Sequence, residues 1–107
     1  MIAYVTELND GNYQDVINRN EFVLVDVSAT WCVPCQTLSP VIDELSAEYR
    51  GRILVGKLDA DSNREIITSL SIRNIPAVFF YKNGELVEKS IGFIDKQKLV
   101  EMINNHL

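Results

Sequence analysis

The chain has 107 residues, of which 47% are hydrophobic and 23% are charged. This length and composition are typical of one soluble globular domain, so we expect a single domain over residues 1–107. Ten basic residues against fifteen acidic ones give a net charge of −5, which argues against nucleic acid as a partner. The apolar runs are far shorter than the ~20 residues of a transmembrane helix, and the first residues do not resemble an export signal.

Strand and helix patterns alternate along the first half of the chain. Residues 2–8 predict a strand, and Tyr13, Val16 and Ile17 then recur at helical spacing. Residues 22–27 are almost continuously apolar, which is typical of a central strand covered on both faces of a sheet. After Cys35, a longer amphipathic helix is predicted by apolar residues that share one face: Leu38, Val41, Ile42, Leu45 and Tyr49.

The alternation continues beyond this helix. Residues 53–58 predict another buried strand, and Ser62 with Glu65 resembles a capping box that opens a short helix. Three alternations of strand and helix favour parallel crossover connections between the strands.

The last third of the chain predicts a hairpin and a final helix. Residues 77–81 and 86–91 read as strands, and the Asn83-Gly84 dipeptide between them suits a tight antiparallel turn. Asp95 is suited to cap a helix after the hairpin. The whole pattern therefore predicts an α/β fold, with a mixed sheet and helices on both of its faces.

Two cysteines, Cys32 and Cys35, stand at the junction between a buried strand and the amphipathic helix. With Pro34 at the first helical position, Cys32 would lie at the helix N-terminus, where free N–H groups and the helix dipole stabilise a thiolate and lower the thiol pKa. Cys32 is therefore the predicted nucleophile. Cys35, one turn inside, is expected to be more shielded and to attack the Cys32 sulfur once a mixed disulfide has formed.

Two other interpretations of this cysteine pair are weaker. A structural zinc site needs four ligands, and His106 is the only further candidate that the chain offers. Free cysteines are often simply buried, but a position at a helix start beside a proline is more typical of a reactive pair. The spacing therefore favours redox chemistry over a metal site or an inert core position.

Two charged residues interrupt apolar strands. Asp26 lies within residues 22–27, and Lys57 lies within residues 53–58. A buried carboxyl either raises its pKa or pairs with a cation. If these strands are neighbours, Asp26 and Lys57 would partly neutralise each other, and Asp26 could take the proton of Cys35 as a general base. The alternative is that Asp26 faces outward from its strand.

Together with several other residues, these features resemble the thioredoxin family over essentially the whole chain. The matching residues are Asp26, Ala29, Thr30, Trp31, Cys32, Pro34, Cys35, Pro40, Lys57, Leu58, Asp59, Ile75, Pro76, Asn83, Gly84 and Gly92. The resemblance implies the thioredoxin fold, which is a central five-stranded mixed sheet flanked by four helices. It also implies a cis peptide bond before Pro76.

The resemblance further implies a protein-disulfide reductase in which Cys32 attacks, Cys35 resolves, and Asp26 and Lys57 handle protons. An extended substrate segment would pair with the backbone at Ile75. The substrate-binding surface would consist of Trp31, Val33, Pro34, Ile75, Pro76 and Gly92.

The resemblance implies no bound cofactor and no metal. Electrons would come from NADPH through a flavin-containing thioredoxin reductase. We therefore expect a cytoplasmic monomer whose partners are that reductase and disulfide-containing substrate proteins, with no nucleic acid and no membrane involved.

Two residues depart from the usual family pattern. Val33 stands where the family usually has Gly, and its β-branched side chain cannot relax into positive φ and adds bulk beside the Cys32 sulfur. Ser28 stands where the family usually has Trp, so water or a neighbouring side chain would fill the space. Two alternative functions remain open: an exported thiol oxidase or isomerase, and a thioredoxin-like binding subunit that docks a partner without turnover.

Overall fold

The computed structural model describes residues 2–107, which form five strands and four helices. The strands are β1 (Val5–Leu8), β2 (Phe22–Ser28), β3 (Leu54–Asp59), β4 (Ala77–Lys82) and β5 (Glu85–Ile91). The helices are α1 (Tyr13–Arg19), α2 (Val33–Glu48), α3 (Arg64–Ser69) and α4 (Lys96–Asn104). Each predicted element is present, and only the first strand is markedly shorter than the sequence pattern indicated. No helix within residues 2–107 is long and apolar enough to cross a membrane.

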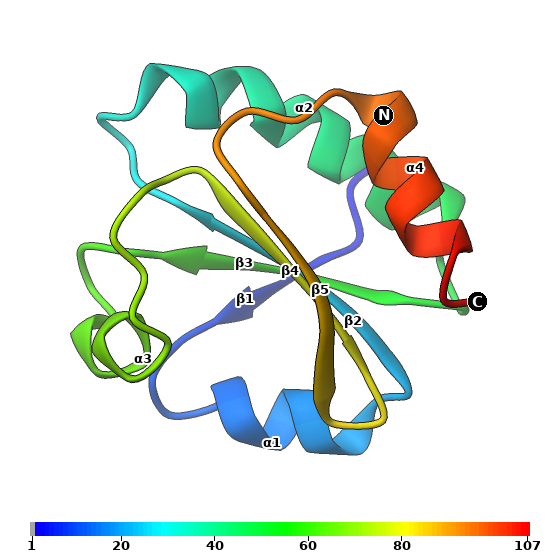
Figure 1. Cartoon of the computed structure of the whole chain (residues 1–107), viewed down its shortest axis with the longest axis horizontal. Helices are drawn as coiled ribbons and strands as arrows, with labels where there is room; N and C mark the ends of the chain where they lie inside the picture. Colours follow the sequence, from blue (N-terminus) through cyan, green and yellow to red (C-terminus); the bar gives the residue numbers. More distant parts are fainter. Residues whose placement is uncertain (1) are drawn as a thin grey trace.

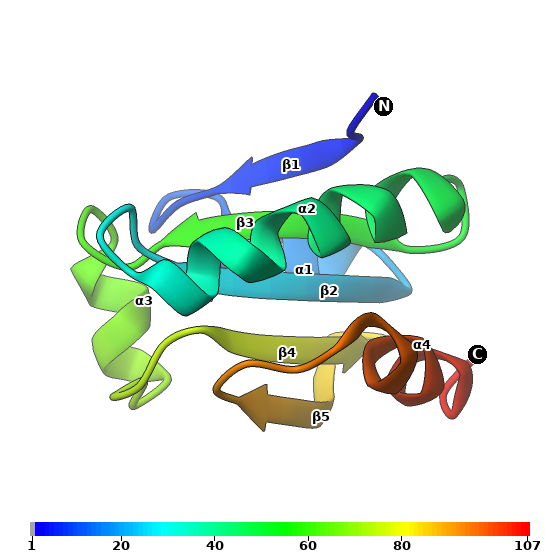
Figure 2. The same cartoon turned by 90° about the horizontal axis from the view of Figure 1, so that it is seen from above.

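The strands form one mixed sheet in the order β1-β3-β2-β4-β5 (Figure 2). Strand β3 pairs in parallel with both β1 and β2, whereas β4 is antiparallel to β2 and to β5. The predicted five-stranded mixed sheet with four helices is therefore confirmed.

The expectation that all three strand-to-helix alternations give parallel crossovers is wrong for the third. Helix α3 has six residues and spans about 9 Å, whereas the six-residue strand β3 spans about 20 Å. The chain therefore leaves α3 near the end of the sheet where it entered. As a result, β4 runs back antiparallel to β2 and β3 instead of repeating their direction.

The helices cover the sheet in pairs, with α2 and α4 on one face and α1 and α3 on the other (Figure 1). The core on the first face includes Leu24, Leu38, Ile42, Leu45, Phe80, Leu99 and Ile103. The core on the second face includes Tyr13, Ile17, Val23, Val25, Leu58 and Phe79. Because residues of β2 and β4 alternate between these two cores, the central strands are apolar on both sides, as the sequence predicted.

Helix α3 begins differently from the prediction. Asn63 is its N-cap residue, and the Ser62 hydroxyl bonds to Asp59 Oδ2 instead of capping the helix. The free N–H groups of Glu65 and Ile66 donate to the carboxylate of Asp10, which precedes α1. The helix start is therefore capped from a distant segment, which the local Ser62/Glu65 spacing could not indicate.

The hairpin and the last helix form as predicted. Asn83 and Gly84 have φ values of 52° and 83°, which the tight turn between β4 and β5 requires. The Asp95 carboxylate accepts a hydrogen bond of 2.9 Å from the backbone N–H of Lys98. Both features depend on residues close in sequence, so the local pattern was sufficient to predict them.

The topology gathers four chain segments at one edge of the sheet. Strands β2 and β3 run in parallel and end there, and β4 is antiparallel to β2 and begins there. Strand β5 runs opposite to β4 and ends beside it. In Figure 1 the N-terminal end of α2 and the loops before β4 and after β5 lie at this same side.

Candidate active site

The two cysteines lie at the N-terminus of α2, just after the loop that follows β2, and they form a disulfide. Cys32 is the N-cap residue and Val33 begins the helix. Pro34 therefore occupies the second helical position, whereas the sequence predicted the first. The backbone N–H of Cys35 donates to the Cys32 sulfur over 3.3 Å. A helix N-terminus therefore directs an N–H donor at this sulfur, which is an arrangement that stabilises a thiolate.

Both cysteines are buried in this oxidised form. Cys32 is 5% exposed and Cys35 is 2% exposed, and Ala29 and Ile75 pack against them. The exposed fractions of the two cysteines therefore differ only slightly. Their positions on the helix differ more clearly, because Cys32 precedes the helix while Cys35 belongs to its first turn.

Asp26 lies in the middle of β2 and is 1% exposed, so the outward-facing alternative is wrong. Across the sheet it is paired with Lys57 on β3 and Val78 on β4. Neither carboxyl oxygen has a hydrogen-bond partner within the described part of the chain. Burial raises the pKa of Asp26 from 3.8 to about 6, against the opposing effect of the Lys57 charge and with a smaller upward contribution from Asp43.

Lys57 is the register neighbour of Asp26, but its ammonium group binds elsewhere. Lys57 Nζ lies 2.7 Å from Asp43 Oδ1 and 2.7 Å from Ser39 Oγ, both on α2. The expected mutual neutralisation is therefore only partial: Lys57 acts on Asp26 through space, while its direct ion pair is with Asp43.

The sequence-based prediction missed Ser39 and Asp43. Both lie on α2, four residues apart, and positions at this spacing share one face of a helix. A half-buried lysine in an apolar strand needs a partner. The polar residues Ser39 and Asp43 on one face of the adjacent helix were therefore the pattern in the sequence that could have indicated the partners of Lys57.

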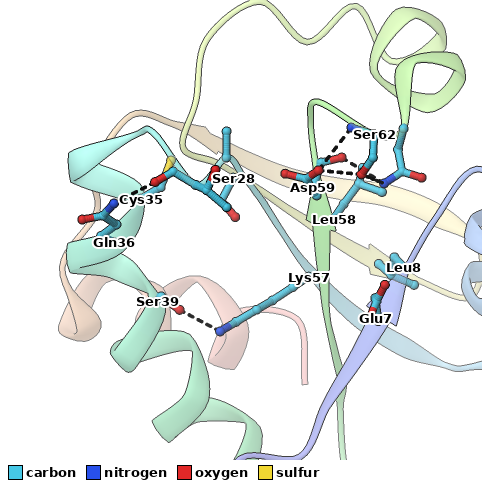
Figure 3. Close-up of a pocket in the computed structure, with 13 residues that line it drawn as sticks. Glu7, Leu8, Ser28, Cys35, Gln36, Ser39, Lys57, Leu58, Asp59 and Ser62 are labelled. Carbon is cyan, nitrogen blue, oxygen red and sulfur yellow. Dashed lines mark hydrogen bonds between the residues drawn. The ribbon is translucent and has the colours of Figure 1, made fainter.

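A pocket of about 330 Å³ lies beside Cys35, between α2 and the ends of β2 and β3 (Figure 3). Its wall includes the half-buried Ser28 together with Lys57 and Ser39. The small side chain of Ser28 therefore leaves space next to Cys35, and Lys57 extends along this space toward Ser39 (Figure 3).

One loop from the second half of the chain contacts the cysteines, and a second loop is hydrogen-bonded to the first. The Ile75-Pro76 peptide bond is cis, as the resemblance implied, and Ile75 packs against the cysteine pair. The carbonyl of Pro76 accepts a hydrogen bond of 2.8 Å from the N–H of Gly92, which has a φ of 90° that favours glycine. Residues that are about 40 and about 60 positions beyond the cysteines thus complete one surface.

Large apolar side chains are exposed at the N-terminus of α2 and at the end of β5. Trp31 is 67% exposed and Val33 is 68% exposed, and the indole N–H of Trp31 donates to Asp61 Oδ2 over 2.9 Å. Ile91 and Phe93 are 51% and 54% exposed. The sequence-based prediction missed the last two because an apolar residue near the end of a strand usually belongs to the core.

A sequence profile described as thioredoxin matches residues 4–105. The chain belongs to the thioredoxin family. It is therefore a thiol–disulfide oxidoreductase, and its redox group is the Cys32–Cys35 disulfide.

Individual thioredoxins align with most of this chain. A chloroplastic M-type thioredoxin from Spinacia oleracea is 43% identical over 107 residues, and the alignment covers 99% of this chain but 59% of the spinach protein. Thioredoxin C-2 from Corynebacterium nephridii is 38% identical, with both chains covered completely. A solved mutant thioredoxin from Halobacterium salinarum is 30% identical and superimposes with a TM-score of 0.87, covering 95% of this chain and 89% of that chain.

The thioredoxin fold accommodates both unusual residues of this chain. Val33 begins α2 and is not among the described residues with positive φ, so its position needs no glycine. Ser28 borders the pocket beside Cys35. Within residues 2–107, no group of three or more His, Cys, Asp or Glu side chains converges as metal binding would require.

Proposed function

We propose that this thioredoxin family member reduces disulfide bonds in other proteins, with Cys32 as the attacking group and Cys35 as the resolving group. The observation that carries the proposal is the N–H of Cys35 directed at the Cys32 sulfur at the start of α2. Such a donor favours the thiolate, which is the form of cysteine that attacks disulfides.

The reaction transfers two electrons from the reduced cysteine pair to the substrate. The Cys32 thiolate attacks one sulfur of the substrate disulfide, forms a mixed disulfide and releases the other substrate sulfur as a thiolate, which takes a proton from water. The Cys35 thiol then loses its proton and attacks the Cys32 sulfur. This step forms the Cys32–Cys35 disulfide and releases the second substrate thiolate.

Asp26 is the proposed acceptor of the Cys35 proton. Its carboxyl is buried and has no hydrogen-bond partner among the described residues, and burial raises its pKa to about 6. At about pH 7 it is mostly ionised and more basic than an exposed carboxylate, which suits a general base. Lys57 on the neighbouring strand partly offsets the cost of ionising this carboxyl through space, while its direct ion pair is with Asp43.

The proposed substrate-binding surface surrounds the cysteines. It consists of Trp31, Val33, Pro34, Ile75, Pro76 and Gly92. The exposure of Trp31 and Val33 and the packing of Ile75 on the cysteine pair support this assignment. An extended substrate segment would add to the backbone at Ile75 as a short strand.

The proposed electron source is NADPH, through a flavin-containing thioredoxin reductase. We place the protein in the cytoplasm as a monomer and as one domain over residues 1–107. The family relationship supports the reductase as a partner. The continuous cores on both faces of a single sheet support one domain.

A trapping experiment tests the proposed function. Cys35→Ser keeps the attacking sulfur but removes the resolving one, so mixed disulfides with substrate proteins are expected to accumulate on Cys32 and to be released by dithiothreitol. The control is the double variant Cys32→Ser/Cys35→Ser, which should capture none. The reduced wild-type protein should in parallel reduce the disulfides of insulin.

Two outcomes would overturn the proposal. If Cys35→Ser traps nothing and the wild type reduces no disulfide, while partner binding survives in the double variant, the chain is a binding subunit. If equilibration with glutathione buffers leaves the wild type as a net oxidant of protein thiols, it is a thiol oxidase.

A further inference from the structure

The charges around Asp26 are unequal in number. Among residues 2–107, the ammonium group that acts on it is that of Lys57, the residue paired with it across β2 and β3. Carboxylates face Lys57 from several elements: Asp43 from α2, the exposed Glu7 from the register position on β1, and Asp59 two residues along β3. One ammonium group therefore cannot neutralise every carboxylate around the pocket.

Helix α2 decides where this ammonium group lies. Asp43 and Ser39 each contact Lys57 Nζ at 2.7 Å, and both sides of the ion pair are about one-third exposed, with side chains at 28% and 30%. Asp26 is 1% exposed, and neither of its oxygens has a partner among residues 2–107. Pairing at the half-buried position avoids the desolvation that full burial of Lys57 beside Asp26 would require.

We propose that Asp43 is a positioning residue: with Ser39 it holds the Lys57 ammonium group on the α2 side, so that the Asp26 carboxyl keeps its affinity for the Cys35 proton. Asp43 contacts neither sulfur and acts only through Lys57 and its own charge. The inference rests on the proposed function solely for the source of the proton, Cys35.

The direction of the effect follows from the charges. Without the Asp43 carboxylate, Lys57 loses its direct partner, and the nearest buried carboxyl that can attract it is Asp26. The positive charge would then favour the ionised form of Asp26. Asp26 would bind a proton less tightly and become a weaker base.

The test is the titration of the Asp26 carboxyl by ¹³C NMR in the oxidised protein, where the cysteines do not titrate. Asp43→Asn is expected to lower the midpoint of the Asp26 titration by about one pH unit, the effect of bringing an opposite charge close to a carboxyl. Glu44→Gln is the matched control. It also removes a negative charge from α2, at the residue next to Asp43, but the partner of Glu44 is Lys96 and not Lys57. It should leave the midpoint unchanged.

A double-mutant cycle identifies the route of the effect. In a Lys57→Met background, Asp43→Asn should move the midpoint much less, since no ammonium group remains to be repositioned. The inference is overturned if Asp43→Asn leaves the midpoint where it is in the wild type, or if it moves the midpoint equally with and without Lys57. If Asp43→Asn does not fold, Asp43→Ser is judged by the same two outcomes.

A kinetic measurement separates positioning from simple damage. The rate at which Cys35 resolves a preformed mixed disulfide should rise with pH along the Asp26 titration. Asp43→Asn should shift that rise to lower pH, whereas general damage would lower the rate at every pH. Because the NMR titration requires no turnover, a chain that reduces no disulfide would refute the proposed function without touching this inference.

Discussion

At the scale of single residues, Asp26 is the most unusual group in the protein. Its carboxyl is 1% exposed, and no group within residues 2–107 is hydrogen-bonded to either oxygen, so ionising it costs free energy. The resulting pKa of about 6 has a consequence for stability as well as for proton transfer. The folded protein binds this proton more tightly than the unfolded chain does, so protonation favours folding.

We therefore expect folding stability to fall as pH rises through the Asp26 titration. The contribution of Asp26 is fully present below its unfolded pKa of 3.8 and is lost as pH rises past about 6. Each pH unit of difference corresponds to about 1.4 kcal/mol, so the loss is about 3 kcal/mol. Asp26→Asn does not ionise and should lack this loss.

Urea unfolding of the oxidised protein at about pH 5 and about pH 8 measures the part of this loss that falls above pH 5, which is about 1.4 kcal/mol because one pH unit separates pH 5 from the folded pKa of about 6. The difference in unfolding free energy between Asp26→Asn and the wild type should grow in favour of the variant at the higher pH. Other titrating groups cancel in this comparison. An equal difference at both pH values would mean that the Asp26 carboxyl is not perturbed by burial.

At the scale of elements, the two helix starts on which the site depends are stabilised in different ways. Helix α2 is capped by Cys32, whose sulfur accepts a hydrogen bond from the N–H of Cys35 in the first turn. Helix α3 has no cap of its own and relies on the carboxylate of Asp10 from the loop before α1. The loop between β1 and α1 therefore holds α3 in place on the second face of the sheet.

Asp10→Ala should lower the unfolding free energy by about 1 kcal/mol, the usual effect of removing a helix cap. The variant leaves the N–H groups of Glu65 and Ile66 without their acceptor. Asp15→Ala is the control, because Asp15 forms an exposed pair with Arg19 on α1 and should contribute much less. Urea unfolding curves compare the two variants, and a loss at Asp10 no greater than that at Asp15 would contradict the cap.

At the scale of the whole molecule, one sheet supports two separate cores. The residues of β2 and β4 point alternately toward α2 and α4 and toward α1 and α3. The active site lies at the edge where these strands begin or end. Loss of packing on either face therefore affects the same central strands and, through them, the site.

Substitutions on opposite faces of the sheet should therefore both lower the free energy of the same cooperative unfolding transition. Leu45→Ala on α2 and Ile17→Ala on α1 each remove a fully buried side chain and should each cost about 2–5 kcal/mol. Far-UV circular dichroism follows the whole chain, and the fluorescence of Trp31, the single tryptophan, follows the site. The two signals should change together in both variants. A variant that shifts one signal and not the other would contradict a single cooperative domain.

Local sequence determined those features whose causes lie within a few residues. The apolar spacing of α2, the Asn83-Gly84 turn and the Asp95 cap each depend on near neighbours in the chain. The position of Cys32 at a helix start was also predictable, because an amphipathic pattern follows the cysteine pair directly. At this helix start, the structure differs from the prediction in the position of Pro34, which lies one residue further into the helix than expected.

Tertiary structure alone decided which distant groups meet. Asp43 takes Lys57 as its partner, Asp10 caps α3, and Ile91 and Phe93 remain exposed at and after the end of β5. Each of these depends on strand order or on the direction of β4, which join segments tens of residues apart. Sequence periodicity reports which side of an element is buried, but it carries no information on which other element lies against that side.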